Sequence, residues 1–347
     1  MKELKRLLCE HLERYPQLTP RDLAKLIYQN EFGSGHFIND EEVSLARLTE
    51  EVKGLTYTPG ELFEDIGNGL VRLNLKALGH ALSLQTVNRF FVLTAAQERG
   101  NREEFEAKLS ILREFYPPAD VDSFLEEYKE AGYPPMSHSP RYREHYSPSY
   151  RVVRRVFALY FPIFERIEQL VANQGSTSVV AIDGRSSSGK SSLGQLLQDV
   201  YGCPVIAMDD FFLRPEQRTV SRLGEPGGNI DYERFQLEVI PKLKGGNPFH
   251  YRVYNCQQNN FIISPTIKSH RLTVVEGCYS HHPTFVESYD LKVFLTVSPE
   301  VQKERLLKRS GPAMLERFVN EWIPLEELYF SVLDIPRKSD VILDTGE

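Results

Sequence analysis

The sequence has few cysteines and no long hydrophobic run. Its four cysteines are widely spaced and form neither a Cys-x-x-Cys pair nor a Cys/His cluster, which argues against a disulfide scaffold and a structural zinc site. No apolar run approaches the roughly 18 residues that span a bilayer. The first residues have the pattern of an amphipathic helix and lack a signal peptide's apolar core. We therefore expect reduced thiols, no membrane partner and a cytoplasmic location.

The chain also has no large excess of charge of one sign. It carries 41 basic and 48 acidic side chains, a net charge of −7, which argues against a nucleic-acid-binding surface. Its 347 residues, 41% hydrophobic and 26% charged, have the composition of a globular protein and are enough for about two domains. Disorder, collagen and coiled coil are excluded as descriptions of the whole chain.

The pattern of apolar residues changes near residue 172. Before it, apolar positions recur every three or four residues, which predicts a separate, mainly α-helical domain over residues 1–172. Several prolines predict a loop or linker-like stretch over 132–148, and the apolar spacing predicts a last helix over 148–172. Residues 173–347 instead alternate β-branched runs with helical patterns. This alternation predicts an α/β domain with a mainly parallel sheet flanked by helices.

Five strands are expected in this second domain, and they are 178–182, 204–207, 272–275, 291–297 and 340–343. A segment with the spacing Gly-x-x-x-x-Gly-Lys-Ser lies directly between the first strand and a helix, which is the context of a phosphate-binding loop (P-loop). Its glycines let the backbone curl so that N–H groups point at phosphate oxygens, and the helix N-terminus adds positive potential.

Within this loop, Lys190 is expected to reach the β- and γ-phosphates and Ser191 to bind Mg²⁺. The predicted ATP-binding residues are Gly184, Arg185, Ser186, Ser187, Ser188, Gly189, Lys190, Ser191 and Ser192. No Asn-Lys-x-Asp segment for reading guanine is present, which argues against a GTPase.

Charged residues stand at the places where the expected strands end. Asp209 follows one apolar run and Glu276 ends another, so both should project from the carboxyl edge of the sheet, where open α/β folds bind ligands. Arg305, Lys308 and Arg309 share one face of a predicted helix because they are spaced by three and four residues. One helical face can therefore carry three positive charges.

With these residues, the second half resembles the uridine kinase-like branch of P-loop kinases, which includes phosphoribulokinase, pantothenate kinase and nicotinamide riboside kinase. The resemblance spans about residues 177–345, and its segments in order are the P-loop, 208–212, 228–235, 248–252, 274–277, 305–309 and 339–343. It implies an enzyme that transfers the γ-phosphoryl group of ATP, with Mg²⁺, to a hydroxyl of a small, ribose-containing metabolite.

The resemblance also implies roles for single residues. Asp209 would be the base that accepts the hydroxyl proton, with Asp210 as the alternative. The implied catalytic residues are Asp209, Lys190, Arg305 and Arg309, of which the two arginines lie on a lid helix. The residues implied to bind the metal are Ser191, Glu276 and Asp209. The residues implied to bind the substrate are Asp231, Tyr251 and Arg252. In one place the chain departs from uridine kinases, which have a histidine where it has Asn255-Cys256-Gln257. This departure argues against a pyrimidine nucleoside as the acceptor.

Residues 1–172 show no resemblance to a family of known activity. Two polar segments, 28–36 and 138–146, are either binding sites for an anion or second substrate, or a helix-connecting loop and a linker. The helical half would regulate the kinase, form a homodimer or deliver substrate. The alternative functions are an ATP sensor whose helical half signals to a partner protein, and a helical half with its own activity on the same metabolite.

Overall fold

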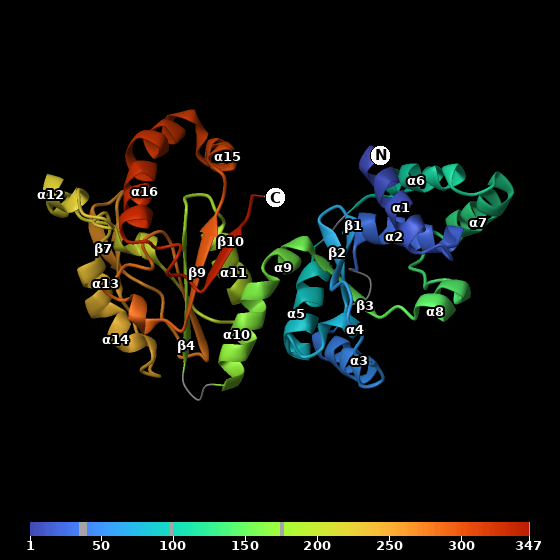
Figure 1. Cartoon of the computed structure of the whole chain (residues 1–347), viewed down its shortest axis with the longest axis horizontal. Coiled ribbons are helices and arrows are strands. Elements are labelled where there is room, and N and C mark those ends of the chain that lie inside the picture. The colour runs from blue at the N-terminus through green and yellow to red at the C-terminus, as the bar shows by residue number, and fades with distance from the viewer. Residues whose placement is uncertain (35–39, 98–99, 174–176, 347) are drawn as a thin grey trace. The chain divides into compact units, whose positions relative to one another are not determined.

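The computed structural model describes residues 1–34, 40–97, 100–173 and 177–346, and the chain forms two compact units, Met1–Phe161 and Pro162–Glu347 (Figure 1). The first unit is mainly helical and the second contains a parallel sheet, so the predicted fold class is confirmed. Among the described residues, no helix combines the length and apolar character needed to cross a membrane.

The sheet of the second unit has its P-loop strand in the middle. Its order is β10-β9-β4-β8-β5, and each neighbouring pair is parallel. The strands are β4 (Ser178–Gly184), β5 (Val205–Ala207), β8 (Leu272–Glu276), β9 (Leu291–Thr296) and β10 (Val341–Asp344), which match the five predicted strands. Their carboxyl ends therefore meet at one edge, as the sequence predicts.

Helices cover both faces of this sheet. Val179 and Ala181 of β4 share a buried core with α13 (Tyr232–Glu238), α14 (Ile240–Leu243) and α16 (Ile323–Val332). Successive side chains of a strand point to opposite faces, and α11 (Lys190–Tyr201) lies against β4, β5 and β8 on the other side. The Phe164 ring of α10 (Phe161–Asn173) contacts Tyr201 of α11. Burial on both faces explains the continuous apolar runs of these strands.

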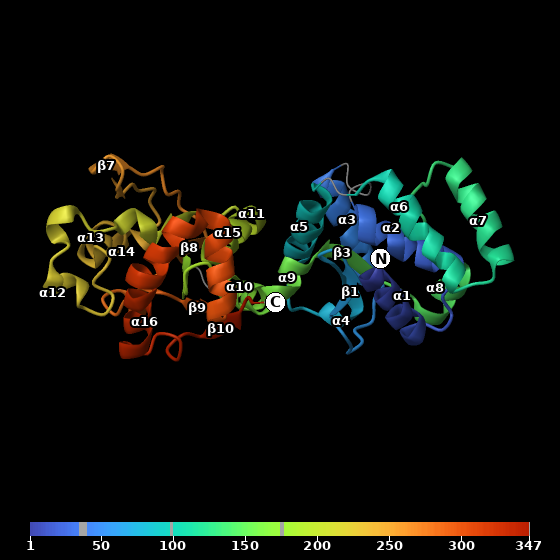
Figure 2. The same cartoon turned by 90° about the horizontal axis from the view of Figure 1, so that it is seen from above.

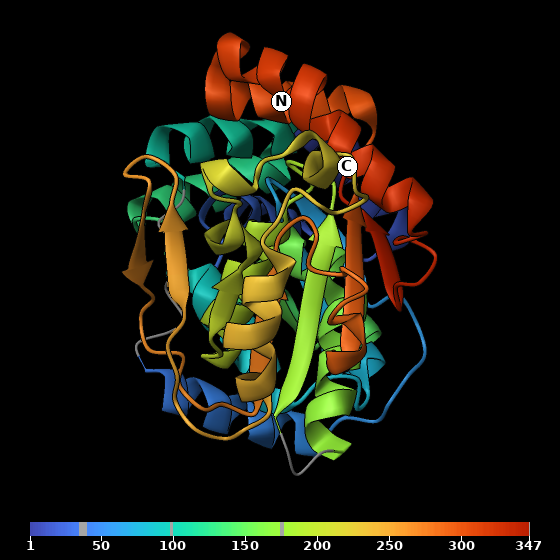
Figure 3. The ribbon, with the colours of Figure 1, turned by 90° about the vertical axis from the view of Figure 1, so that its left-hand side faces the viewer.

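The remaining elements of the second unit surround the carboxyl edge. A 3-10 turn, η3 (Met208–Phe211), follows β5, and a short helix α12 (Val220–Leu223) precedes α13. The hairpin of β6 (Arg252–Asn255) and β7 (Asn260–Ile263) stands beside the sheet, and the last two helices, α15 (Pro299–Arg317) and α16, lie above the sheet (Figure 3). The first of these, α15, is kinked at Gly311, where φ is +78° and Pro312 follows. A π-helical segment, Phe318–Trp322, leads on to α16.

The first unit contains a small antiparallel sheet, which the sequence analysis missed. Its order is β1-β2-β3, with β1 (Phe63–Gly67), β2 (Leu70–Asn74) and β3 (Tyr150–Arg154). Helix α5 packs against β3, and α1 and α2 pack against β1 (Figure 2). The helices of the unit are α1 (Lys2–Arg14), α2 (Pro20–Phe32), α3 (Glu41–Lys53), α4 (Leu75–Leu78), α5 (Leu84–Ala95), α6 (Arg102–Leu109), α7 (Pro118–Glu130), α8 (Pro140–Tyr146) and α9 (Arg155–Leu159).

The helix predicted over 148–172 was wrong in its first part, because that part is strand β3 followed by the short helix α9. Val152 and Val153 pair with Arg72 and Val71 of β2, and local spacing cannot reveal a partner so distant in sequence. The stretch 132–148 contains helix α8. Ser139 within it donates hydrogen bonds to the buried Asp22, so this stretch is packed into the first unit.

Candidate functional site

The loop between β4 and α11 has the geometry of an anion site. Gly184 ends β4 with φ of +142°, and a Cβ there would lie 2.0 Å from the carbonyl oxygen of Leu295. Only glycine fits this close approach of two backbones. Gly189 is left-handed, with φ of +95°, and α11 begins at the next residue. The loop therefore leads directly into the N-terminus of α11, which is the position that the motif predicts for a phosphate-binding loop.

Lys190 bonds back to the start of the loop, and Ser191 connects the loop to the neighbouring strand β8. The Nζ of Lys190 donates to the carbonyl oxygens of Gly184 and Arg185, both at 2.9 Å. The hydroxyl of Ser191 donates to Oε2 of Glu276 at 3.1 Å. Glu276 pairs with Ile182 of β4 and with Ala207 of β5, two residues before Asp209. Sheet register therefore brings both predicted carboxylates to the P-loop.

The two carboxylates at this edge differ in exposure, because Glu276 is buried and Asp209 is exposed. Partial desolvation by the surrounding protein raises the pKa of Asp209, and the charges of Lys190 and Arg309 oppose the shift. Burial also raises the pKa of Glu276, against the effect of its hydrogen bond from Ser191. Among the described residues, no side chain or N–H donates a hydrogen bond to the Asp209 carboxylate. Asp209 is therefore an exposed proton acceptor whose carboxylate oxygens have no donor among the described residues.

The oxygen atoms of Ser191, Glu276 and Asp209 fit Mg²⁺. This ion prefers oxygen ligands and is often held by one or two carboxylates together with substrate phosphates. Within the described ranges, no three His, Cys, Asp or Glu side chains gather into a metal site of their own. The available donors, a hydroxyl and two carboxylates beside a P-loop, are thus suited to a metal shared with a nucleotide.

The two predicted lid arginines of α15 have different environments. Arg305 donates through Nη1 to the carbonyl oxygen of Ser187 at 3.4 Å and to Oγ1 of Thr345 at 3.2 Å, and through Nη2 to the carbonyl oxygen of Thr345. Arg309 is exposed, stacks over Phe318, and is one of the two charges that act on Asp209. Arg305 thus anchors the loop, whereas Arg309 contacts only its neighbours Ser310 and Phe318 among the described residues and stays exposed.

The predicted acceptor residues lie around η3. The hydroxyl of Tyr251 donates to Oδ2 of Asp210 at 2.7 Å, so Asp210 already has a partner. Asp231 caps α13 and pairs with Nε of Arg234 at 3.2 Å. Arg252 pairs with Glu238 through Nε at 2.6 Å. Tyr251 thus contacts the turn that carries Asp209 directly, and Asp231 and Arg252 contact it through Arg234.

Several polar residues that were not predicted contact the loop or the residue before it. Asp183, fully buried, accepts hydrogen bonds from the N–H groups of Gly184, Tyr279 and His281 and from the hydroxyl of Tyr329. Glu326 accepts from the N–H of Ser186 at 3.0 Å and from its hydroxyl. Asp183 could have been found from its place before the P-loop. Glu326 and Tyr329 lie on α16, far along the chain, with no local signal.

The polar segments of the first unit are used within its core. Gln29 accepts two hydrogen bonds from Arg72, at 3.1 and 2.8 Å. His138 lies between Oδ1 of Asp22 at 3.1 Å and the hydroxyl of Tyr150 at 2.6 Å, and burial lowers the pKa of His138 to about 4. Positions 35 and 36 of the first segment lie outside the described residues. The described part of this network joins α2, β2 and β3.

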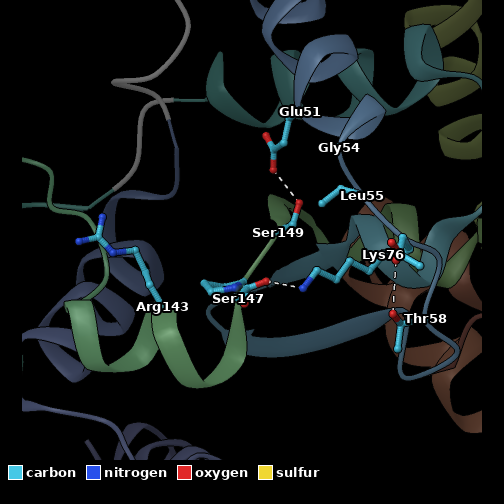
Figure 4. Close-up of a pocket in the computed structure, with 10 residues that line it drawn as sticks. Glu51, Gly54, Leu55, Thr58, Lys76, Arg143, Ser147 and Ser149 are labelled. Carbon is cyan, nitrogen blue, oxygen red and sulfur yellow. Dashed lines mark hydrogen bonds between the residues drawn. The ribbon is translucent and has the colours of Figure 1, made fainter.

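A pocket of 530 Å³ lies in the first unit (Figure 4). Lys76 extends to the carbonyl oxygen of Ser147 at 2.6 Å, and the hydroxyl of Ser149 donates to Glu51 at 2.6 Å. Arg143 points away from both contacts. The pocket has the size of a small-molecule site, but its main polar groups are occupied by one another.

Comparison with known proteins gives structural matches only. No family model matches the chain, and no curated protein matches its sequence. The chain is similar to the structure of a possible uridine kinase from Bacillus stearothermophilus, with 18% identity and a TM-score of 0.41 over 53% of this chain and 100% of the other. It is similar to a candidate fructose transport system kinase from Silicibacter sp. TM1040, with 20% identity and a TM-score of 0.41 over 53% and 97%. A D-glycerate 3-kinase from Cryptococcus neoformans matches with 12% identity and a TM-score of 0.32 over 47% and 85%. These likenesses concern the fold of about half of the chain.

Proposed function

We propose that the second unit is an ATP-dependent, Mg²⁺-requiring kinase that phosphorylates a hydroxyl group of a small metabolite. The observation that carries the proposal is the meeting of Lys190, Ser191, Glu276 and Asp209 at one sheet edge, from three separate segments. Phosphoryl transfer needs a phosphate cradle, a cation to neutralise charge and a proton acceptor near the attacking oxygen. These residues supply each of those functions.

The chemistry follows from the position and charge of each side chain. Asp209 accepts the proton of the acceptor hydroxyl while the hydroxyl oxygen forms a bond to the γ-phosphorus. The bond between this phosphorus and the β–γ bridging oxygen breaks, and ADP leaves. Lys190 and Arg309 stabilise the negative charge on the transferred group. Ser191 and Glu276 would hold Mg²⁺, which supplies further charge neutralisation at the β- and γ-phosphates. Gly311 and Pro312 interrupt α15 just after Arg309, which is where the following segment would hinge if it closes over the nucleotide.

The test is product formation by the full chain. The protein is incubated with Mg-ATP and a pool of nucleosides, vitamin ribosides, hydroxy acids and sugar phosphates, and mass spectrometry reports compounds that gain one phosphoryl group. Lys190→Ala should abolish the product, and Asp209→Asn should retain ATP binding but lose turnover by about 10²- to 10⁴-fold. Lys244→Ala, which removes an exposed lysine paired with Asp290, is the matched control and should keep full turnover.

Two outcomes would contradict the proposal. Unchanged product from folded Lys190→Ala would remove the P-loop from the reaction. ATP binding without modification of any acceptor would instead favour a nucleotide sensor whose first unit passes the nucleotide state to a partner protein.

A further inference from the structure

Three arginines surround one aromatic ring next to the proposed acceptor side. The guanidinium carbons of Arg252, Arg234 and Arg214 lie 4.9, 5.2 and 5.8 Å from the ring centre of Phe261, a residue of strand β7. A single cation over a ring is a common stabilising contact. Three like charges so close together repel each other, and their accumulation requires compensation.

This arginine cluster, Arg214, Arg234 and Arg252, adjoins the turn that carries Asp209. Arg234 donates through Nη2 to the carbonyl oxygen of Asp210 at 3.0 Å and stacks over Phe211 at 4.3 Å. Strand β6, which begins at Arg252, lies against η3. A molecule whose hydroxyl reaches Asp209 therefore has the cluster within the reach of a small metabolite.

The three guanidinium groups differ in how far the protein itself neutralises them. Arg234 is buried and uses its N–H groups on Asp231, Asp210 and Arg252. Arg252 and Arg214 have side chains that are 53% and 41% exposed, and their acidic partners are Glu238 and Glu216.

These two exposed arginines keep unused donors. Nη1 of Arg252 and Nη2 of Arg214 have no partner among the residues that the structure describes. Nearby, Arg218 donates only to the carbonyl oxygen of Leu213 within the described part of the chain, so its positive charge has no carboxylate partner. The exposed side of the cluster thus offers N–H donors with positive charge, a combination that binds phosphate or carboxylate groups.

We propose that the phosphoryl acceptor is an anion, whose phosphate or carboxylate group binds Arg214 and Arg252 beside Phe261 while its hydroxyl reaches Asp209. This proposal rests on the kinase function proposed above and specifies its substrate class. A neutral nucleoside would leave these donors without an acceptor group. An anionic acceptor uses them and relieves the repulsion within the cluster.

The experiment compares acceptors in matched pairs that differ in charge but share the hydroxyl group. The pairs are glycerate and glycerol, ribose 5-phosphate and ribose, and pantothenate and pantothenol, each assayed with Mg-ATP by mass spectrometry and coupled ADP release. We expect the charged member of at least one pair to have a kcat/KM at least 10-fold above that of its neutral partner. Whether that member is a carboxylate or a phosphate identifies the anionic group.

Variants then assign the effect to the cluster. Arg214→Met and Arg252→Met should each raise KM for the charged acceptor by about 10- to 100-fold, the loss expected for one charge-assisted contact, with KM for ATP changed less than about 2-fold. Arg271→Met is the matched control, because Arg271 is exposed and directly precedes β8, at the sheet edge opposite Asp209. It should leave both KM values unchanged.

The possible failures are distinguishable. A neutral member that is phosphorylated as well as its charged partner overturns the anionic acceptor and leaves the kinase in place. Unchanged KM for the charged acceptor in both variants overturns the role of the cluster. If ATP binds, as measured by calorimetry, and neither these pairs nor the wider acceptor pool yields a phosphorylated product, the proposed kinase fails and the acceptor class fails with it.

Discussion

Tyr329→Phe should destabilise the second unit by about 2 kcal/mol, although it removes a single oxygen atom. The Tyr329 hydroxyl is fully buried and donates to Oδ2 of Asp183 at 2.8 Å. A hydrogen bond to a charged group contributes about 1.5–3 kcal/mol. No basic side chain pairs with Asp183 among the described residues, so its charge depends on four hydrogen-bond donors. Removing one donor leaves three.

Asp183→Asn should cost more, about 3–5 kcal/mol. The new amide group replaces one oxygen, so either the pair of donors on Oδ1 or the pair on Oδ2 faces an N–H₂ group. The hydroxyl of Tyr329 can rotate to accept from this group, whereas the backbone N–H of His281 cannot. One buried donor is then unsatisfied and the charge assistance of the other bonds is lost. In this background Tyr329→Phe should cost only about 1 kcal/mol, which gives a coupling of about 1 kcal/mol.

The assay is urea unfolding followed by tryptophan fluorescence and circular dichroism. Trp322 is the single tryptophan of the sequence and lies in the second unit, so its fluorescence reports on that unit. Tyr232→Phe is the matched control, because the Tyr232 hydroxyl contacts Glu225 at an exposed site, and its cost should stay below about 0.5 kcal/mol. A Tyr329→Phe cost equal to that of the control, or strictly additive effects with Asp183→Asn, would refute the reasoning.

Three other changes test separate parts of the site. Gly184→Ala should prevent stable folding of the second unit, because the new Cβ would lie 2.0 Å from the carbonyl oxygen of Leu295. Gly202→Ala places its Cβ in open space and should lower the free energy of unfolding by only about 1 kcal/mol, as measured by urea unfolding. Equal costs for the two variants would contradict the packing argument. Burial and the charge of Arg222 lower the pKa of His282 to about 4 from its usual value of 6.5. The unfolded state therefore binds more protons between these two values, and the stability of the second unit should fall as the pH drops from 6.5 to 4. His282→Asn should flatten this slope when unfolding is followed by Trp322 fluorescence, and an unchanged slope would exclude His282 as its origin. Glu326→Gln removes a carboxylate charge beside the P-loop but keeps an oxygen for the N–H of Ser186. Because this negative charge would repel the phosphates, calorimetry should show several-fold tighter ATP binding in the variant. Weaker binding would mean that the charge itself organises the loop.

Much of the second unit could be predicted because its signals are local. A strand buried on both faces is a continuous apolar run, and the P-loop is a fixed spacing within one segment. Parallel pairing then fixes which ends meet, so Asp209 and Glu276 could be placed at one edge before any contact was known. The register that sets Glu276 opposite Ala207 agrees with this expectation.

The features that escaped prediction depend on distant parts of the chain. Arg305 and Arg309 share one helical face, but only the fold shows that Thr345 engages Arg305 and leaves Arg309 exposed. Glu326 reaches Ser186 across the unit, and nothing near either residue announces the contact. The arginines around Phe261 come from three different segments. In each case the partner is determined by tertiary packing, which spacing along the chain does not encode.

The place of β3 in the first unit has a consequence for how the protein is made. During synthesis β2 emerges with its hydrogen-bonding edge bare, and this edge stays bare until Tyr150–Arg154 has left the ribosome. A nascent chain paused in this interval, or a fragment cut within 132–148, presents an open strand to which other chains can add. The first unit is therefore best separated after Phe161, where the two units divide and its sheet is already complete.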